Sequence, residues 1–348
     1  MKLSVLMPVY NGQRYLAEAV DSVLGQSFGD FELIVVDDGS TDGTSEVLAG
    51  YGDPRLRVAR TPHRGLIPAL ERAAAEAQGP YLARMDDDDR SDPRRFAEQV
   101  RVLDQRDDVA LVTCYADLID ADGACRGVYR PPLSDDLILD LAAGNPLVHG
   151  SVMMRRRDFL EAGGYSRAPE DYALWIRLAR QGKRFAVVPD VLYAFRTHPS
   201  RYSLTHTRSQ SEAILEVQRP LLIECMRTRD RSDPAVHAKL LRGWGRLGAA
   251  ALLGGRPRIA ERAARWVFRL DRKRPELHAN DHAAFDDAAE ALVWSGCPFS
   301  TALHLRLRQW RRNPLSTVRL RDLALCFPMI ESARRRMKSW SKSGSDAG

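Results

Sequence analysis

The chain has 348 residues, of which 44% are hydrophobic and 28% are charged, and its formal net charge is +6. This is the composition of an ordinary globular protein, and the length is enough to bury a sizeable core. No apolar run approaches the length of a membrane span, and the longest candidate, 249–253, is far too short. The five cysteines are scattered and odd in number, which argues against a disulfide framework or a zinc site and indicates a reducing compartment.

Charge is divided unevenly along the chain. Residues 206–348 hold 27 of the 52 Lys/Arg and 15 of the 46 Asp/Glu, which gives this part +12 and leaves −6 for residues 1–205. The division predicts two domains with different partners, one at 1–205 and a basic one at 206–340. The polar stretch 341–348 is expected to be a disordered tail.

The first hundred residues alternate between apolar runs and helical periodicity. The N-terminal run LSVLMPV predicts a strand at 3–9, buried on both faces, rather than a signal peptide. The same patterns predict further strands at 31–36, 56–59 and 81–85, and helices at 16–24, 44–49 and 66–77. Strands and helices joined by short links indicate a doubly wound α/β sheet of the nucleotide-binding type. No G-x-G-x-x-G follows Val9 and no Walker lysine motif occurs, which argues against phosphate binding by a glycine-rich turn.

The later elements follow from the same signals. A strand is predicted at 109–113, and Asp122-Gly123 is typical of a hairpin turn. A helix is predicted from Ser134, a strand at 149–154, a short helix at 158–162 and a strand at 187–195. From about 206 onward strand signals fade and the pattern predicts an all-helical C-terminal region.

Four consecutive aspartates, Asp86 to Asp89, follow the predicted strand at 81–85. In open α/β sheets ligands bind at the carboxyl ends of the strands, where these residues fall. Adjacent carboxylates repel one another, so a bound cation is expected to neutralise them. Carboxylate oxygens are hard ligands, which favours Mg²⁺ or Mn²⁺ over zinc or copper. Asp92 and Pro93 then predict the N-cap and first residue of a helix.

Two other interpretations of the acidic stretch remain. It could be a solvated turn that caps the following helix. It could also be a calcium loop, since Asp87, Asp89, Ser91 and Glu98 match its first, third, fifth and twelfth positions. Asp92 stands where such a loop requires glycine, however, and a strand rather than a helix precedes it.

A second pair of acids, Glu170 and Asp171, lies in the first turn of a helix whose buried face is marked by Leu174, Trp175 and Leu178. Acids in this position stabilise a helix by interaction with its dipole. The same setting favours the ionised carboxylate that a general base requires. His198, at the end of the strand predicted at 187–195, could pair locally or supply a nitrogen ligand to a metal.

With these residues in place, roughly the first 200 residues resemble a family 2 glycosyltransferase of the GT-A fold. The resemblance is carried by SVLMPVYNG at 4–12, SVLGQSF at 22–28, FELIVVDDGSTDGT at 31–44, ARMDDDD at 83–89, HGSVMMRR at 149–156, EAGGY at 161–165, EDYALWIRLARQG at 170–182 and LYAFRTH at 192–198. These pieces occur in the order and spacing of the family. The resemblance stops near 205.

The resemblance implies roles for particular residues. It implies a D-x-D metal motif at Asp86, Asp87 and Asp88, with Asp88 as the direct ligand. His198, from its place at the strand end, remains a further candidate for the same metal. It also implies a catalytic aspartate at Asp171, beside Glu170. The nucleotide pocket would be formed by strand-end residues, with Asp38 on the base: Pro8, Tyr10, Asn11, Asp37 and Asp38. His63 and Arg72 depart from the asparagines usual in the family.

The activity implied is inverting, metal-dependent transfer of a sugar from a nucleoside-diphosphate sugar to a hydroxyl acceptor, with Mg²⁺ or Mn²⁺ as cofactor. The setting would be polysaccharide, lipopolysaccharide or glycoconjugate synthesis. Residues 181–185 only echo the Q-x-x-R-W motif of processive members, so a non-processive enzyme is expected. A nucleotidyltransferase and a non-catalytic sugar-nucleotide-binding protein remain alternatives.

The segment 301–342 carries eleven Lys/Arg interleaved with leucine and tryptophan. It could be a helical cap with a solvated basic face. It could also attach the protein peripherally to an anionic membrane, where a lipid-linked glycan acceptor would be extended. No nucleic-acid-binding motif accompanies the charge. We therefore expect a cytoplasmic protein, peripheral on the inner face of the membrane if the second interpretation holds.

Overall fold

The structure is a computed structural model that describes residues 1–166, 168–198, 207–253, 259 and 263, and the statements below concern these residues. Its strands are β1 (Leu3–Val9), β2 (Phe31–Asp37), β3 (Leu56–Arg60), β4 (Tyr81–Arg84), β5 (Arg90–Ser91), β6 (Val109–Ile119), β7 (Cys125–Tyr129), β8 (Met153–Arg155) and β9 (Arg184–Arg196). Its helices are α1 (Leu16–Leu24), α2 (Thr44–Ala49), α3 (Leu66–Glu76), α4 (Arg95–Gln105), α5 (Leu137–Ala143), α6 (Arg156–Glu161), α7 (Glu170–Arg180), α9 (Thr207–Thr228) and α10 (Pro234–Leu253), with a 3-10 helix, η1, at His149–Ser151.

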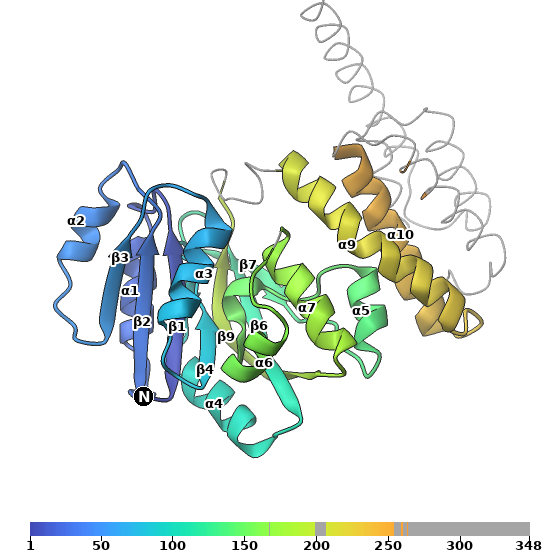
Figure 1. Cartoon of the computed structure of the whole chain (residues 1–348), viewed down its shortest axis with the longest axis horizontal. Helices are drawn as coiled ribbons and strands as arrows, with labels where there is room; N and C mark the ends of the chain where they lie inside the picture. The colour runs from blue at the N-terminus through green and yellow to red at the C-terminus, as the bar shows by residue number, and fades with distance from the viewer. Residues whose placement is uncertain (167, 199–206, 254–258, 260–262, 264–348) are drawn as a thin grey trace, which may run out of the picture. The chain divides into compact units, whose positions relative to one another are not determined.

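The strands form one mixed sheet in the order β3-β2-β1-β4-β8-β6-β9-β5, and β7 pairs with β6 (Figure 1). Strands β3, β2, β1 and β4 are parallel to one another, and β6 is parallel to β9. Strand β8 is antiparallel to both β4 and β6. Because β4 and β6 are both antiparallel to β8, they point the same way, and β9 is parallel to β6. The carboxyl ends of β4 and β9 therefore lie at the same edge of the sheet.

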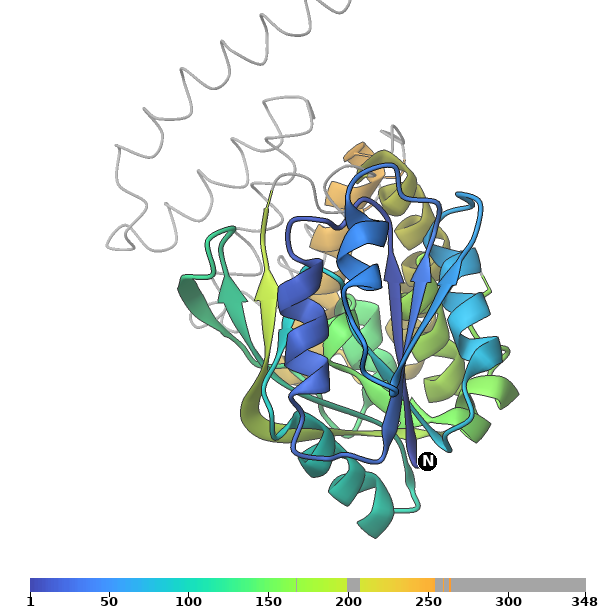
Figure 2. The same ribbon diagram turned by 90° about the vertical axis from the view of Figure 1, so that its left-hand side faces the viewer.

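The core lies on both faces of β1, all seven residues of which are buried. Side chains alternate across a strand, so Leu3, Val5 and Met7 join one cluster with apolar residues of α1 and α4. On the other face Ser4 donates a hydrogen bond to Glu32 at 2.7 Å, and α3 packs against β1 and β2. Figure 2 shows α1 and α3 on opposite sides of these strands. The doubly wound arrangement predicted from the sequence is confirmed.

The predicted elements agree with the observed ones in the first half of the sheet. Further on, β5 was not predicted, β9 begins at Arg184 rather than 187, and four other places differ. Helix α4 begins at Arg95 rather than after Asp92, because Asp92 accepts from the Arg94 N–H in a turn that precedes the helix. Helix α5 begins at Leu137 rather than Ser134, because Asp136 caps it by accepting from the Leu139 N–H at 3.1 Å. The strand predicted at 149–154 is the helix η1 followed by a short β8. Strand β6 extends to Ile119, where the predicted hairpin turn at Asp122-Gly123 leads into β7.

Two compact units divide the chain, Met1–Gly243 and Trp244–Gly348. The first extends beyond the domain boundary predicted near 205, because α9 packs on α5 and Gln218 donates to the carbonyl of Ala142 at 3.1 Å. The basic segment 301–342 and the tail at 341–348 lie outside the described residues. In the part of the chain that the structure describes, no helix has the length and apolar character needed to cross a bilayer.

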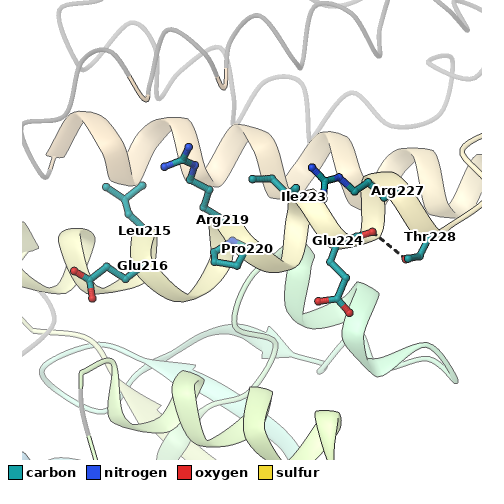
Figure 3. A pocket seen from close by; sticks show the side chains of 8 residues that line it. All are labelled: Leu215, Glu216, Arg219, Pro220, Ile223, Glu224, Arg227 and Thr228. Carbon is teal, nitrogen blue, oxygen red and sulfur yellow. Dashed lines mark hydrogen bonds between the residues drawn. The ribbon is translucent and has the colours of Figure 1, made fainter.

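One face of α9 borders a pocket of about 610 Å³ (Figure 3). Its lining combines apolar and charged side chains: Leu215, Glu216, Arg219, Pro220, Ile223, Glu224, Arg227 and Thr228. None of these is a site residue predicted from the sequence, and all of them belong to α9.

Candidate active site

The predicted site residues come together where the parallel strands end. Asp86 to Asp89 follow β4, and Tyr10 and Asn11 follow β1. Asp37 is the last residue of β2, Asp38 follows it, and His198 follows β9. The loop 86–89 is called the acidic loop below. The common direction of these strands explains why residues up to 110 positions apart meet here.

The acidic loop is anchored through its last residue. The carboxylate of Asp89 is buried and accepts from the Tyr193 hydroxyl at 2.7 Å and from the Arg196 N–H at 2.6 Å. The buried Arg196 side chain also donates to the carbonyl of Asp88 at 2.7 Å and pairs with Glu18 of α1. Strand β9 and helix α1 therefore hold the loop in place. The sequence motif LYAFRTH contains both anchors but does not indicate this role.

Asp86, Asp87 and Asp88 of the acidic loop are partly exposed, and Asp89 is buried. Asp88 is 23% exposed, and its Oδ2 lies 2.8 Å from the Nε2 of His198. Asp86 is 28% exposed and is paired at 2.7 Å with the buried guanidinium of Arg84. Of the three metal ligands expected from the sequence, Asp88 and His198 are in direct contact, whereas Asp86 is paired with Arg84.

The carboxyl groups of Asp87 and Asp89 lie in an environment that disfavours their ionised form. Burial, followed by the neighbouring carboxylates of Asp88 and Asp86, raises the pKa of Asp87 and of Asp89 well above the usual range. The backbone of the β1 loop packs directly on this cluster, since a Cβ at Gly12 would lie 2.3 Å from the Oδ2 of Asp87. An added positive charge at this edge would favour the ionised form of Asp87 and Asp89.

The donor atoms at this edge fit a hard or borderline divalent cation, because they are carboxylate oxygens with one imidazole nitrogen. Within the described ranges, no group of three or more His, Cys, Asp or Glu side chains converges to form a complete metal cage. Asp88 and His198 offer a partial set instead. The Asp88 carboxylate suits Mg²⁺ or Mn²⁺, since hard cations of this kind are held through one or two carboxylates together with substrate phosphates and water.

The predicted nucleotide pocket presents one aromatic surface. Tyr10 is 45% exposed, and its ring stacks on that of His63 with the centroids 3.9 Å apart. Asn11 has a φ of 55°, a conformation that asparagine tolerates better than most residues. Its side-chain oxygen accepts from the Thr41 N–H at 2.8 Å, and this bond joins the β1 and β2 loops.

The two aspartates at the end of β2 are buried and hold loops. Asp38 accepts from the N–H groups of Arg64 and Gly65 at 2.9 and 2.8 Å, and it lies 2.8 Å from the Nδ1 of His63. Asp37 accepts from the Ser40 N–H at 2.9 Å. Pro8 is buried inside β1 in register with Val36. Among the predicted nucleotide contacts on these two loops, Tyr10 and Asn11 are therefore the exposed ones.

The predicted catalytic pair occupies the first turn of α7. The Oδ2 of Asp171 accepts from the Nδ2 of Asn145 at 2.7 Å, and its Oδ1 accepts from the Tyr172 N–H. Glu170 is buried, with its Oε1 3.8 Å from the Nδ1 of His149. Burial and the charge of Asp171 raise the pKa of Glu170 to about 7. Burial also raises the pKa of Asp171, while the bonds from Tyr172 and Asn145 oppose that rise.

The helix η1 connects the catalytic pair with the acidic loop. His149 faces Glu170 and lies 3.0 Å from the hydroxyl of Tyr165, and burial together with the charge of Arg84 lowers its pKa well below the usual value. At the next position, a Cβ on Gly150 would lie 1.8 Å from the Tyr193 hydroxyl and 2.7 Å from the Oδ2 of Asp86. Glycine is required here because the backbone touches the acidic loop. The sequence motif HGS at 149–151 did not indicate this role, and no sequence pattern singled out Asn145.

Residues 4–164 match the family model described as glycosyl transferase family 2. A protein of Bacillus subtilis (strain 168) named "Putative glycosyltransferase EpsE" is 34% identical over 227 residues, which cover 62% of this chain and 81% of that protein. This chain belongs to glycosyltransferase family 2. A Haemophilus influenzae protein named "Uncharacterized glycosyltransferase" is 27% identical to this chain, over 62% of this chain and 72% of that protein.

Solved structures agree with this assignment at the level of the fold. Staphylococcus aureus TarS in complex with UDP-GlcNAc superposes on the glycosyltransferase with a TM-score of 0.54 at 17% identity, covering 84% of this chain and 91% of that one. The mannosyltransferase PcManGT from Pyrobaculum calidifontis, in complex with GDP-Man and Mn²⁺, gives a TM-score of 0.52 at 19% identity, covering 88% and 86%. The glycosyltransferase therefore has the GT-A fold that the sequence analysis expected.

Proposed function

We propose that this glycosyltransferase moves a sugar from a nucleoside-diphosphate sugar to a hydroxyl acceptor in a single, inverting displacement, with Asp171 as the general base. The observation that carries the proposal is the environment of the Asp171 carboxylate. Both of its oxygens accept hydrogen bonds, from Asn145 and from the Tyr172 N–H, and these bonds favour the ionised form. An ionised, positioned carboxylate beside the acidic loop is what a base for this reaction requires.

In this mechanism the acceptor hydroxyl attacks the anomeric carbon as its proton passes to Asp171. One displacement inverts the configuration, in contrast to the two-step reaction of retaining hydrolases, which needs a carboxylate nucleophile. The pKa of Glu170 is raised to about 7 by burial and by the charge of Asp171, and Glu170 faces His149. We therefore propose that Glu170 does not take the acceptor proton and instead influences the electrostatic environment of Asp171.

The leaving nucleoside diphosphate would lie against the exposed side of the acidic loop. Asp88 and His198, with Asp86, would hold Mg²⁺ or Mn²⁺ there, and the bound ion would neutralise the charge that develops on the leaving group. Support comes from the donor atoms at this edge and from the raised pKa values of Asp87 and Asp89. The PcManGT neighbour binds GDP-Man together with Mn²⁺. The base of the nucleotide would stack on the exposed ring of Tyr10.

A screen of donors tests the proposal. The full-length protein should show a rise in melting temperature with one or more UDP-, GDP- or dTDP-sugars in the presence of Mn²⁺. Turnover of that donor should release nucleoside diphosphate. Release of pyrophosphate would indicate a nucleotidyltransferase instead, and donor binding without turnover of any acceptor would indicate a non-catalytic sugar-nucleotide-binding protein.

We also propose that the acceptor is a glycan or a lipid-linked glycan and that the basic segment 301–342 brings the enzyme to an anionic, cytoplasmic membrane surface. The support is the sequence alone, eleven Lys/Arg interleaved with large apolar residues. The protein should sediment with anionic vesicles at low salt and should dissociate from them at high salt. It should not bind zwitterionic vesicles. Replacing Arg334, Arg335 and Arg336 by Gln should weaken the binding, and equal binding by this variant would argue for a solvated cap.

A further inference from the structure

Asn145 makes two hydrogen bonds that together define its orientation. Its Nδ2 donates to the Oδ2 of Asp171 at 2.7 Å, and its Oδ1 accepts from the Leu147 N–H at 3.2 Å. A backbone N–H can only donate, so the atom facing Leu147 must be the amide oxygen. The amide nitrogen consequently faces Asp171.

The loop that carries Asn145 is itself held in place. It follows α5 at Gly144, whose φ of 138° lies in the region that favours glycine. Further along, the carbonyl of Pro146 accepts from the Tyr129 hydroxyl of β7 at 3.0 Å. Asn145 is thus attached to a loop fixed at both ends, on an element different from the helix that bears Asp171.

We infer that Asn145 is the positioning residue of the general base: it holds the Asp171 carboxylate in one rotamer and in its ionised form. The inference rests on the proposed role of Asp171. The Tyr172 N–H belongs to the same helix turn as Asp171, so it moves with the base. Asn145 is the described side chain that donates to this carboxylate from another element.

The charged groups around Asp171 determine the sign of the effect. Glu170 on α7 and Asp86 on the acidic loop add negative charge, and burial acts in the same direction. Arg84 and His149 face Glu170, and the hydroxyl of Tyr165 lies within electrostatic range of both acids. Removing the Asn145 donor therefore raises the pKa of Asp171, and the acidic limb of the pH profile of kcat/KM moves to higher pH.

Asn145→Asp separates positioning from a purely structural role. The new side chain has the same shape and can still accept from the Leu147 N–H, but it presents an oxygen to Asp171 instead of a donor. We expect kcat to fall by about tenfold to a hundredfold at pH 7 and the acidic limb to move up by about one pH unit. The KM for the donor should change by less than about threefold.

Two further variants complete the experiment, which uses full-length protein with the donor found in the screen and Mn²⁺. Asn145→Ala removes the donor without adding charge, so its acidic limb should also move up. It covers the case in which Asn145→Asp does not fold cooperatively. Tyr129→Phe loosens the same loop through the carbonyl of Pro146 without touching Asp171, and its acidic limb should stay at the wild-type position.

The inference is overturned if a folded Asn145 variant keeps the wild-type acidic limb, or if Tyr129→Phe shifts it equally. The second result would mean that loop rigidity alone matters. Failure of the proposed function looks different: in that case Asp171→Asn itself retains near wild-type turnover, or no donor is turned over at all.

Discussion

The Nε2 of His198 lies 2.8 Å from the Oδ2 of Asp88, although 110 positions separate the two residues in the chain. The contact exists because β9 and β4 end at the same edge of the sheet. It is reinforced next to His198, where Arg196 holds both Asp88 and Asp89 through its side chain and its backbone N–H. Asp88 and His198 thus form one preorganised pair.

Asp88→Asn should weaken nucleoside-diphosphate binding in the presence of Mn²⁺ by tenfold or more, because a carboxylate ligand and its charge are lost. Calorimetric titration with and without Mn²⁺ measures the effect. The matched control is Asp122→Asn, in the β6–β7 turn, whose side chain is 91% exposed and should contribute nothing. If the effect of Mn²⁺ on nucleoside-diphosphate affinity is the same in Asp88→Asn as in wild type, Asp88 is not a metal ligand.

Asp171→Asn should lower kcat by about 10²–10⁴, the range for loss of a general base, because an amide cannot accept the proton. Affinity for the nucleoside diphosphate should stay within about threefold of wild type. Asp190→Asn, an exposed aspartate on β9, provides a control of the same chemistry. If steady-state kinetics show a near wild-type kcat for Asp171→Asn, Asp171 is not the general base and serves only to stabilise the N-terminus of α7.

Gly150→Ala should destabilise the fold by about 1–3 kcal/mol, because its Cβ would overlap the Tyr193 hydroxyl, which Asp89 holds in place. Adding Tyr193→Phe removes the overlapping oxygen, so the double variant should lose less stability than the two single changes predict together. Urea denaturation measures all four proteins. Gly127→Ala, with nothing within 4 Å of the added Cβ, is the control, and equal losses at the two glycines would contradict the close contact.

Glu170→Gln should stabilise the protein above pH 7. The pKa of Glu170 is raised from 4.5 to about 7 in the folded state, so the folded protein binds this proton more tightly than the unfolded chain. The stability it contributes is complete below pH 4.5 and is lost as the pH rises through about 7. The variant lacks this loss and should gain on the order of 1–3 kcal/mol relative to wild type at pH 8. Melting curves from pH 4 to 8 should show the gap opening with pH, and a constant gap would refute the assignment.

The sequence by itself determined the elements whose signal is local. The buried run of β1, the strands that end in Asp37-Asp38 and in the acidic loop, and the position of Glu170-Asp171 in the first turn of α7 were all predicted correctly. In each case one short segment contains both the apolar pattern that makes the element and the acids that follow or begin it. The order of these segments was also enough to identify the family.

Only the tertiary structure decided which residues meet. The contacts of Asn145 with Asp171, Gly150 with Tyr193 and Arg196 with Glu18 each join separate elements. The apolar pattern at 149–154 predicted a strand, yet residues 149–151 form a 3-10 turn because Gly150 must pass close to the acidic loop. Such contacts depend on how the sheet orders β4, β8, β6 and β9, and that order arises from packing over long sequence separations, for which no local pattern carries a signal.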